Sequence, residues 1–573
     1  MQEWRIYSKK ADFEAIGRQY GLDPVVARII RNRDIIGDEA VSRYLYGGMK
    51  DLYSPHLMKD MDKAVDIIAT AVKSDDKIRI IGDYDIDGIC SIYILFKGLK
   101  KAGANVDYEV PNRISDGYGI NENLIKQAYD DGCRVIITCD NGIAAISQIE
   151  YAKSLGMIVV VTDHHDVQYE ETDGERQYIL PVADAVVDPK RPDCTYPFKS
   201  LCGAGISYKF ICCLYEKMGI PLKETEEFIE FAAIATVGDI VDLQDENRII
   251  VKEGLKRLAY TDNYGLNSLM KLTDVKKENL SAYHIGFIIG PCLNASGRLD
   301  TAKRAIKMLL AADREEAECY AGELKELNDE RKRITLEATK NAVEIVEGSF
   351  LVNDKILVIF LPDCHESIAG IVAGKIREKY YKPTIVLTKA EDGLKGSARS
   401  IESYNIFEKL LDCKDLLTKF GGHPMAAGLS LKEENLEALR IKLNSSHGLT
   451  QNDLTQKIWI DVPMPIDYIS YKVIEDLSVL APFGKANEKP VFADKNLIIR
   501  QVQSIGKAGN FTRLFLEKEN GRGIEAVGFF PSDELSKAYA DKKRISCTYY
   551  PEINEFRGNR KLQICITGYK IET

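Results

Sequence analysis

Short apolar runs and longer helical patterns alternate along the chain from residue 77 to residue 166. The apolar runs KIRIIG, VDYEV, RVIITCD and MIVVVTD are rich in β-branched residues, as buried strands are. Between them, residues 89–102, 121–131 and 144–155 carry apolar positions at helical spacing. Repeated strand–helix units of this length predict a parallel sheet covered by helices.

The pattern changes after this sheet. Residues 205–219 and 225–237 are predicted to be helical, and the charged run 314–347, which contains almost no helix breakers, predicts a long connecting helix. A second strand–helix unit begins at KILVIFLP. Beyond residue 490, short alternating runs are separated by turns containing glycine and charged residues. These runs predict a small β-barrel or sandwich.

A chain of 573 residues is long enough for several hydrophobic cores, so we expect a multidomain α/β protein. The predicted parts are an N-terminal extension packed on the next part of the chain (1–50), a parallel-sheet domain (51–313), a connecting helix (314–347), a smaller α/β domain (348–450) and a β-rich domain (451–573).

Composition and charge say more about where the protein is expected to act than about the reaction it catalyses. No apolar run approaches the roughly 18 residues of a membrane span, and the N-terminus has no signal-peptide segment, so we expect a cytoplasmic protein without membrane contact. The 13 cysteines form no CxxC pairs and are expected to be reduced thiols. Residues 494–573 carry 14 Lys and Arg against 10 Asp and Glu, in a chain of formal net charge −10. This segregation indicates a C-terminal module that binds polyanions.

Three aspartates, Asp83, Asp85 and Asp87, directly follow the first predicted strand. Their spacing of two would place the carboxylates on one side of an extended segment. A calcium loop is rejected, because its twelfth position would be Ile94 and a strand precedes the motif. A strand-end turn or helix N-cap accounts for one or two aspartates, but not for three in an apolar context. Metal ligation is the interpretation we favour.

Asp140 ends the run RVIITC, and Asp163, His164 and His165 end the run VVVT. Taken alone, Asp140 could be a cap residue and the two histidines a core pair. However, the carboxyl ends of parallel strands meet at one sheet edge, where ligands bind. Carboxylates with imidazole and no thiolate suit Mn²⁺ or Mg²⁺. A paired site of this kind hydrolyses phosphoryl groups, so we expect a phosphate ester or anhydride as the substrate.

Two arginines lie among small residues that allow a phosphate to come close. They are Arg298 in LNASGR and Arg399 in KGSARS, although a local ion pair would equally explain either one. His423 lies in the small-residue turn GGHPMAAG, and Asp239 follows a helical segment in ATVGDIVDL. Neither His423 nor Asp239 would carry a prediction by itself.

Taken together, DYDIDG, TCDNG, TDHH and VGDI, followed by GSARS and GGH, resemble the DHH phosphoesterase superfamily. LNASGR and the β-rich C-terminal region point to its branch of single-strand-specific 5′→3′ exonucleases. The resemblance implies a parallel-sheet DHH domain joined by a long helix to a smaller α/β domain across a groove, followed by an OB-like nucleic-acid-binding barrel. The implied reaction releases 5′-mononucleotides from DNA during repair and recombination.

The resemblance also implies roles for individual residues. The ligands expected for two Mn²⁺ or Mg²⁺ ions are Asp85, Asp87, Asp140, His164 and Asp239, with Asp140 between the ions. Asp83 is expected to support these ligands, Asp163 to orient a histidine, and His165 to lie over the scissile phosphate. The residues expected to hold phosphates of the strand are Arg113, Arg298, Ser397, Arg399 and His423, with Arg113 near the 5′ end.

The chain departs from the pattern of this branch at two places. Residues 363–367 read DCHES where a W-H-x-G turn is common, and Cys292 stands where arginine is common. Both departures concern contacts to the strand and leave the metal chemistry untouched. The implied partners are single-stranded DNA, single-strand-binding protein and a RecQ-type helicase.

Two alternatives remain beside this interpretation. One is a DHH phosphodiesterase acting on short oligonucleotides, cyclic dinucleotides or pyrophosphate, which would not require the long, β-rich C-terminal region. The other is a non-catalytic DHH replication scaffold. The intact Asp and His set speaks against a scaffold, because buried carboxylates without metal are costly.

Overall fold

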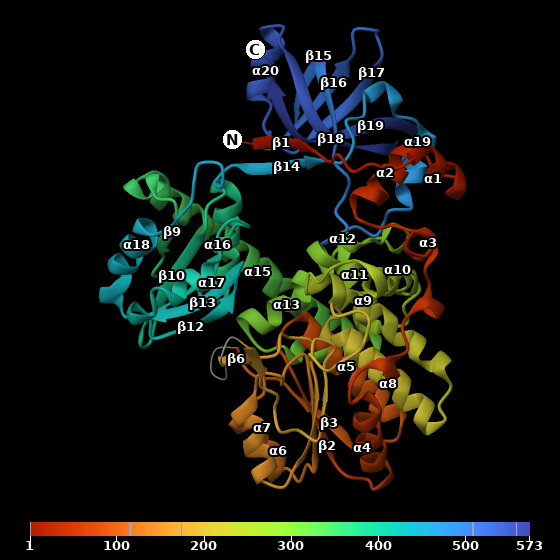
Figure 1. The fold of residues 1–573 in the computed structure, drawn as a ribbon, viewed down its shortest axis with the longest axis vertical. Helices are drawn as coiled ribbons and strands as arrows, with labels where there is room; N and C mark the ends of the chain where they lie inside the picture. The colour runs from red at the N-terminus through yellow and green to blue at the C-terminus, as the bar shows by residue number, and fades with distance from the viewer. Residues whose placement is uncertain are drawn as a thin grey trace.

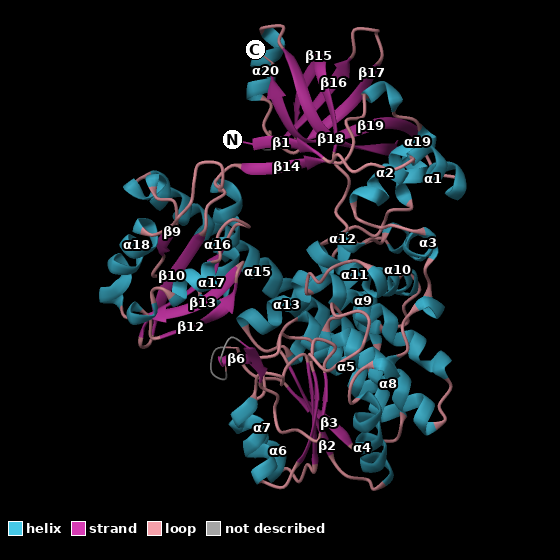
Figure 2. Cartoon of the chain, in the orientation of Figure 1, coloured by secondary structure: helices cyan, strands magenta, loops and turns pink. Residues whose placement is uncertain are grey.

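The computed structural model describes residues 2–113, 117, 119–172, 175–506, 509–556 and 558–572. Its first α/β unit is a five-stranded sheet in the order β3-β2-β4-β5-β8, and every pairing in it is parallel (Figure 2). The strands are β2 (Ile78–Gly82), β3 (Val106–Glu109), β4 (Val135–Cys139), β5 (Ile158–Thr162) and β8 (Ala185–Val187). The predicted parallel sheet is therefore confirmed, and β8 is an additional edge strand.

Helices cover both faces of this sheet. Ile80 and Ile137 contribute to a core shared with α4 (Met61–Lys73), α5 (Ile86–Lys101) and α8 (Gly203–Met218). The alternate residues, including Ile81 and Ile136, face a second core under α6 (Glu122–Asp130) and α7 (Ile146–Ser154). Strands buried on both faces explain the continuous apolar runs in the sequence. A short hairpin of β6 (Tyr169–Thr172) and β7 (Glu175–Tyr178), not predicted from the sequence, follows β5.

A layer of helices packs on this α/β unit. Its members are α9 (Ile229–Gly238), α10 (Asp245–Leu258), α11 (Tyr264–Leu272), α12 (Ala282–His284), α13 (Gly290–Leu299) and α14 (Lys303–Leu310). A π-helical turn, Ile285–Ile289, joins α12 to α13. The long helix α15 (Arg314–Glu347) has the bounds predicted from the sequence and leads to the next α/β unit (Figure 1).

The second α/β unit contains a five-stranded sheet in the order β12-β13-β11-β10-β9. Its strands are β9 (Leu357–Phe360), β10 (Thr384–Ala390), β11 (Gly393–Arg399), β12 (Lys419–His423) and β13 (Ala426–Leu431). Only the β9–β10 pairing is parallel among these described strands. The helices of the unit are α16 (Glu366–Tyr380), α17 (Ile406–Leu411) and α18 (Leu436–Ser445).

The C-terminal region forms a closed barrel in the order β15-β16-β17-β19-β18. Its strands are β15 (Phe492–Ile505), β16 (Phe511–Glu517), β17 (Gly523–Gly528), β18 (Arg544–Phe556) and β19 (Asn559–Ile571), with α19 (Tyr471–Ser478) and α20 (Asp533–Ala540) beside them. The predicted small barrel is confirmed. Closure pairs the strand edges that an open sheet would expose.

The N-terminal residues pack mainly on the C-terminal part of the chain, whereas we expected them to pack on the part that comes next in the sequence. β1 (Gln2–Ile6) pairs in parallel with β14 (Gln456–Ile460), and the N-terminus lies beside the barrel (Figure 1). Apolar residues of α2 (Pro24–Asn32) and α3 (Asp38–Tyr46) share a core with the barrel strands. The short helix α1 (Phe13–Tyr20) precedes them. These partners lie more than 400 residues away, so local patterns could not reveal them.

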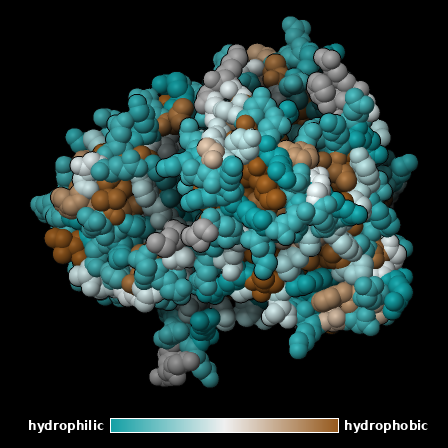
Figure 3. All heavy atoms as spheres, turned by 90° about the horizontal axis from the view of Figure 1, so that it is seen from above, coloured by the Kyte–Doolittle hydropathy of each residue, from teal (hydrophilic) through white to brown (hydrophobic). Residues whose placement is uncertain are grey.

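Viewed from above, the surface carries apolar side chains in small, separate groups among polar ones (Figure 3). Within the described residues, none of the helices combines the length and the apolar character that crossing a bilayer requires.

Candidate active site

The carboxyl ends of the three central strands carry the predicted acidic residues. Asp83 directly follows β2, Asp140 follows β4, and Asp163 follows β5. Asp140 adopts a left-handed backbone with φ of 61°, a conformation that aspartate tolerates better than most residues. The next residue, Asn141, donates hydrogen bonds from its side chain to the carbonyls of Ile81 and Cys139. It thereby ties the ends of β2 and β4 together.

The three aspartates do not lie in one extended segment, because α5 begins at Ile86 and contains Asp87, so that part of the prediction is wrong. Asp85 is the N-cap of α5, and its side chain accepts hydrogen bonds from the backbone N–H groups of Asp87 and Gly88. Asp87 lies in the first turn of this helix and accepts backbone hydrogen bonds from Gly203 (2.6 Å) and Ala204 (2.7 Å) at the start of α8. Helix N-termini stabilise such carboxylates.

Gly203 permits the close approach of α8 to the acidic residues. A Cβ at this position would lie 2.7 Å from the Cβ of Asp140 and 3.2 Å from Oδ2 of Asp87. Any larger residue would therefore push α8 away from the strand ends.

His164 lies at the centre of the acidic cluster. Its Nε2 is 3.0 Å from Oδ1 of Asp140, 3.5 Å from Oδ2 of Asp87 and 3.8 Å from Oδ2 of Asp239, which caps the C-terminus of α9. Three sets of potential ligand atoms lie within 4.8 Å of one another: Asp83–Asp85–Asp140, Asp87–His164–Asp239 and Asp140–His164–His165. All five residues expected as ligands thus converge, together with Asp83 and His165.

The electrostatics of the cluster favour a bound cation. Burial, together with repulsion from neighbouring aspartates, raises the pKa of Asp87 to about 6 and that of Asp239 to about 8. The same causes raise the pKa values of Asp83 and Asp140 well above the ordinary range. Both carboxylate oxygens of Asp83 are buried and accept no hydrogen bond of ordinary geometry from the described residues. A divalent cation would neutralise this repulsion and satisfy these oxygens.

The histidines of the cluster differ in charge. Burial lowers the pKa of His164 to about 3, which leaves the neutral imidazole that metal ligation requires. The opposite holds for His165: burial alone would lower its pKa, but the charge and hydrogen bond of Asp163 outweigh burial and raise it to about 9.

Asp163 is occupied by donors from the protein itself. Its Oδ1 accepts hydrogen bonds from Nδ1 of His165 (2.7 Å) and from the backbone N–H of His164 (2.7 Å), and its Oδ2 accepts one from the backbone N–H of Ile143 (2.8 Å). These contacts match the expected orienting role, because they fix the ring of His165 and leave little capacity for a metal.

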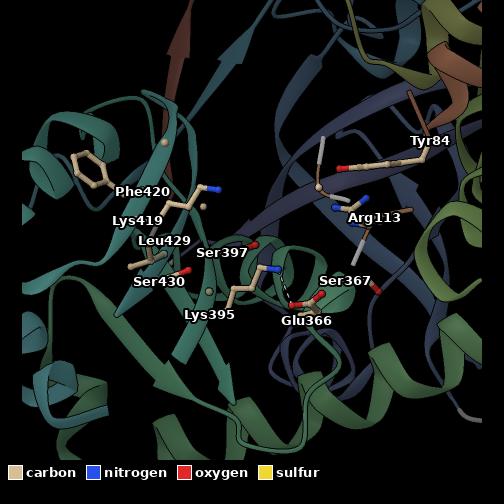
Figure 4. Close-up of a pocket in the computed structure, with 14 residues that line it drawn as sticks. Tyr84, Arg113, Glu366, Ser367, Lys395, Ser397, Lys419, Phe420, Leu429 and Ser430 are labelled. Atoms are coloured by element: carbon tan, nitrogen blue, oxygen red, sulfur yellow. Dashed lines mark ion pairs between the residues drawn. The ribbon is translucent and has the colours of Figure 1, made fainter. Parts of the chain in front are cut away.

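A pocket of about 400 Å³ lies between the two α/β units. Figure 4 shows the residues that line it. Tyr84 and Arg113 line one side, and Lys395, Ser397 and Lys419 line the other (Figure 4). The guanidinium of Arg113 lies 4.8 Å from the centre of the Tyr84 ring. Since Tyr84 stands between Asp83 and Asp85 in the sequence, the pocket adjoins the acidic cluster. The expected groove between the two units is present.

Several arginines are concentrated around this pocket. Burial, together with the positive charges of Arg113, Arg331 and Arg399, lowers the pKa of Arg298 to about 10. Burial and the positive charges of Arg377 and Arg113 lower the pKa of Arg399. Nη1 of Arg298 donates to the carbonyl oxygen of Ser367, 3.0 Å away, and so links the two α/β units. Guanidinium groups that repel one another in a partly buried pocket form a receptor for an anion.

The structure brings Arg113, Arg298 and Arg399 together as expected, and Ser397 lines the same pocket. Arg331 of α15 and Arg377 of α16 belong to this group but were missed. Both lie in helices with many charged residues, where the sequence cannot distinguish a half-buried arginine from a solvated one.

His423 is placed differently from the arginines. It is exposed at the end of β12 and does not line the pocket, but its charge contributes to lowering the pKa of Asp166, after a larger contribution from Lys190.

The two departures from the branch pattern have structural explanations. Cys292 is buried, and its Sγ accepts a hydrogen bond from the side-chain amide of Asn328 at 3.3 Å. His365 is the N-cap of α16, with Nδ1 accepting from the backbone N–H of Ser367. Neither residue lines the pocket.

Comparison with known proteins agrees with this architecture. Residues 77–236 match the DHH family N-terminal domain, residues 353–446 the DHHA1 domain, and residues 460–568 the RecJ OB domain. The single-stranded-DNA-specific exonuclease RecJ of Bacillus subtilis is 36% identical over 568 residues, covering 98% of this chain and 70% of that protein. The Escherichia coli protein of the same name is 31% identical, with 95% of each chain covered.

Solved structures support the same conclusion. The fold matches Thermus thermophilus RecJ in complex with Mn²⁺ with a TM-score of 0.84 and 24% identity, over 99% of this chain and 79% of that one. A structure of exonuclease RecJ bound to manganese is 28% identical with a TM-score of 0.59, over 69% of this chain and 98% of that one. The predicted superfamily and branch are confirmed. The chain belongs to the RecJ family of single-stranded-DNA-specific exonucleases.

Proposed function

We propose that this chain is a metal-dependent exonuclease that degrades single-stranded DNA from the 5′ end and releases 5′-mononucleotides. The observation that carries the proposal is the adjacency of two oppositely charged sites: an acidic cluster around His164, and a pocket lined by Tyr84, Arg113, Lys395 and Lys419 with further arginines around Arg113. The curated relatives carry the name of single-stranded-DNA-specific exonucleases, which supports the substrate class.

The acidic cluster is suited to two divalent cations. One set of ligand atoms comes from Asp83, Asp85 and Asp140, and another comes from Asp87, His164 and Asp239. Asp140 would lie between the two ions, which is supported by its membership of the first set and by the 3.0 Å distance from its Oδ1 to Nε2 of His164 in the second. When bound, Mn²⁺ or Mg²⁺ supplies a water of lowered pKa and neutralises charge on the phosphodiester.

The protein's own residues position the substrate. His165, protonated and held by Asp163, donates a hydrogen bond to an oxygen of the scissile phosphate. Arg113, Arg298 and Arg399 bind the terminal 5′ phosphate in the neighbouring pocket. Because this pocket binds a terminal phosphate, cleavage is restricted to a chain end, and the polarity of degradation follows from which end carries that phosphate.

Degradation of end-labelled strands tests this proposal. With Mn²⁺, a 5′-labelled single strand should release labelled mononucleotide at once, a 3′-labelled strand should shorten as a ladder, and a blunt duplex should remain intact. Turnover of dinucleotides alone would instead move the activity to the small-substrate phosphodiesterases. Absence of any turnover would favour a scaffold.

We also propose that single-strand-binding protein or a RecQ-type helicase delivers the strand, and that the protein acts in the cytoplasm. A pull-down of each candidate with the full-length chain, in the presence of nuclease to remove bridging DNA, tests the contacts.

A further inference from the structure

Two pairs of aromatic rings are stacked nearly parallel within the described part of the chain, and both have exposed members. The ring centroids of Tyr7 and Trp459 are 4.9 Å apart at an interplanar angle of 25°, and those of Tyr283 and Phe287 are 5.0 Å apart at 26°. Trp459 is 43% exposed, Tyr283 61% and Phe287 69%. Exposed rings of this kind present flat apolar faces on which a planar ligand can stack.

The pair Tyr283–Phe287 lies on α12 and the π-helical turn after it, and this turn packs on α9, the helix that ends at the candidate ligand Asp239. Phe287 belongs to the π-helical turn after α12, and a Cβ on its neighbour Gly286 would lie 3.5 Å from Cγ1 of Val237 in α9. Two residues after Val237 comes Asp239, a candidate metal ligand. π-Helical turns frequently mark functional sites.

Ile240, directly after Asp239, adds an exposed apolar residue to this region. It is 66% exposed and has φ of 57°, a left-handed conformation that is strained for a β-branched side chain. Strain of this kind persists mainly at functional sites, where surrounding structure enforces it.

The pair Tyr7–Trp459 lies on the β1–β14 sheet, on the face turned away from the barrel. Trp4 points to the opposite face, where Nζ of Lys570 from β19 lies 4.6 Å from its ring. Arg5 is the register partner of Trp459, so alternation along the strands puts Arg5 and Trp459 on the other face. Arg5 lies 5.8 Å from the Trp459 ring and Lys9 lies 6.0 Å from the Tyr7 ring, and each of these cations is paired with a carboxylate, Arg5 with Glu3 and Lys9 with Asp34.

Hydrogen bonds link the segment after Asp239 to the segment that follows β14. The backbone N–H of Leu243, four residues after Asp239, donates to the carbonyl of Lys485 at 2.8 Å. The carbonyl of Glu488 accepts from Arg33, and the neighbouring Asn32 donates to the carbonyl of Asp461, two residues after Trp459. In Figure 1, α12 lies at the edge of the helical layer nearest the barrel, and β1 and β14 lie beneath the barrel.

We propose that these two pairs are stacking points for bases of the single strand behind its cleaved end, with Tyr283–Phe287 first and Tyr7–Trp459 further along. The inference rests on the proposed function for the identity of the ligand, single-stranded DNA. Aromatic faces stack on every base, so such points bind without sequence preference. They would make binding depend on strand length.

Tryptophan fluorescence provides a readout that needs no hydrolysis. The chain contains two tryptophans, so Trp4→Phe leaves Trp459 as the sole reporter. Without divalent metal, a strand of about 16 nucleotides should quench this emission, whereas a strand of about 4 nucleotides, bound at the terminal-phosphate pocket, should not. Unchanged emission on a long strand shown by anisotropy to be bound would overturn the proposal, as would equal quenching by both lengths.

Binding by substituted proteins gives the second arm of the test. Trp459→Ala, or Tyr283→Ala with Phe287→Ala, should weaken binding of the long strand by about 5-fold to about 100-fold and leave the short strand unaffected. Phe350→Ala is the matched control, since Phe350 is 66% exposed and lies under Arg440 on the second α/β unit. Equal loss for both lengths would contradict the proposal.

The two arms separate this inference from the proposed function. If quenching and length-dependent binding occur but no strand is hydrolysed, the stacking points stand and the exonuclease proposal fails. If hydrolysis occurs normally but Trp459→Ala changes only the oligomeric state or a protein contact, these rings serve a protein interface and the stacking proposal fails.

Discussion

The first α/β unit and the helical layer on it contain two clusters of buried charged residues, which differ in where the neutralising charge comes from. Lys209 and Glu246 form a pair with Nζ 2.8 Å from Oε1, and Glu246 also accepts hydrogen bonds from the Tyr196 hydroxyl and the backbone N–H of Tyr53. Lys209 donates in addition to the carbonyl of Tyr53. Every charge in this cluster is matched within the protein, so it needs no ligand.

Among the described residues, the acidic cluster around His164 is dominated by carboxylates. Its aspartates repel one another, and their pKa values rise as a result of burial and of that repulsion. A buried charge cluster is therefore structural when its partners are internal, and functional when its neutralisation must come from a ligand.

The largest effect is expected from a substitution in the acidic cluster around His164. Asp140→Ala should reduce exonuclease activity by about 10³-fold or more, since it removes a ligand contact that the transition state depends on. The substituted protein should still fold, because one of several repelling charges has been removed. Near-normal turnover, measured on a labelled single strand, would remove Asp140 from the site.

Removing one partner of the Lys209–Glu246 pair should instead reduce the stability of the fold. Glu246→Ala leaves Lys209 buried without its carboxylate and should lower the free energy of unfolding by about 3–5 kcal/mol. Urea denaturation followed by circular dichroism measures this change. A loss below about 1 kcal/mol would show that the pair is less important than its burial indicates.

Glu230 is an intermediate case, a buried carboxyl group with neither a full set of partners nor a metal. It accepts a hydrogen bond from Thr261 on Oε1, while Oε2 is buried without a partner among described residues, and burial raises its pKa to about 7. The folded state therefore holds this proton more tightly than the unfolded state. The stabilisation is full below the unfolded pKa of 4.5 and is lost as pH rises through about 7.

Glu230→Gln should remove this dependence. The difference in unfolding free energy between wild type and Glu230→Gln should change by up to about 3 kcal/mol between pH 5 and pH 8, with the substitution relatively more favourable at the higher pH. Urea midpoints at both pH values measure it. A difference independent of pH would show that Glu230 does not titrate in this range.

The smallest effect is expected at the anion pocket. Arg399→Ala should weaken binding of a 5′-phosphorylated strand by about 10-fold while metal affinity stays unchanged, because several other arginines remain. Fluorescence anisotropy with phosphorylated and unphosphorylated strands measures this loss. Equal affinity of the wild-type and substituted proteins would exclude Arg399 from the phosphate contacts.

The sequence predicts the strand ends of the active site well, since Asp83, Asp140 and Asp163 each stop an apolar run at the carboxyl end of a parallel strand. It also predicts α15, whose charged pattern continues without breakers. Patterns of this kind depend on residues that are near one another in the sequence, so they can be recognised without knowledge of the tertiary contacts.

Features that depend on distant contacts could not be predicted. The pairing of β1 with β14 joins residues more than 400 positions apart, and Arg331 comes near Arg298 only because α15 packs against α13. The spacing of Asp83, Asp85 and Asp87 suggests an extended segment. Asp85 is instead the N-cap of α5, an alternative that the sequence also allows and that spacing alone does not decide.

Calorimetric titration of the full-length chain with Mn²⁺ tests the central claim most directly, because it asks whether the acidic cluster is a metal site independently of activity. We predict two bound ions, release of protons from the carboxyl groups with raised pKa values, and loss of at least one ion in both Asp140→Ala and His164→Ala. Mn²⁺ binding that is absent in the wild type, or unchanged by both substitutions, would contradict the account.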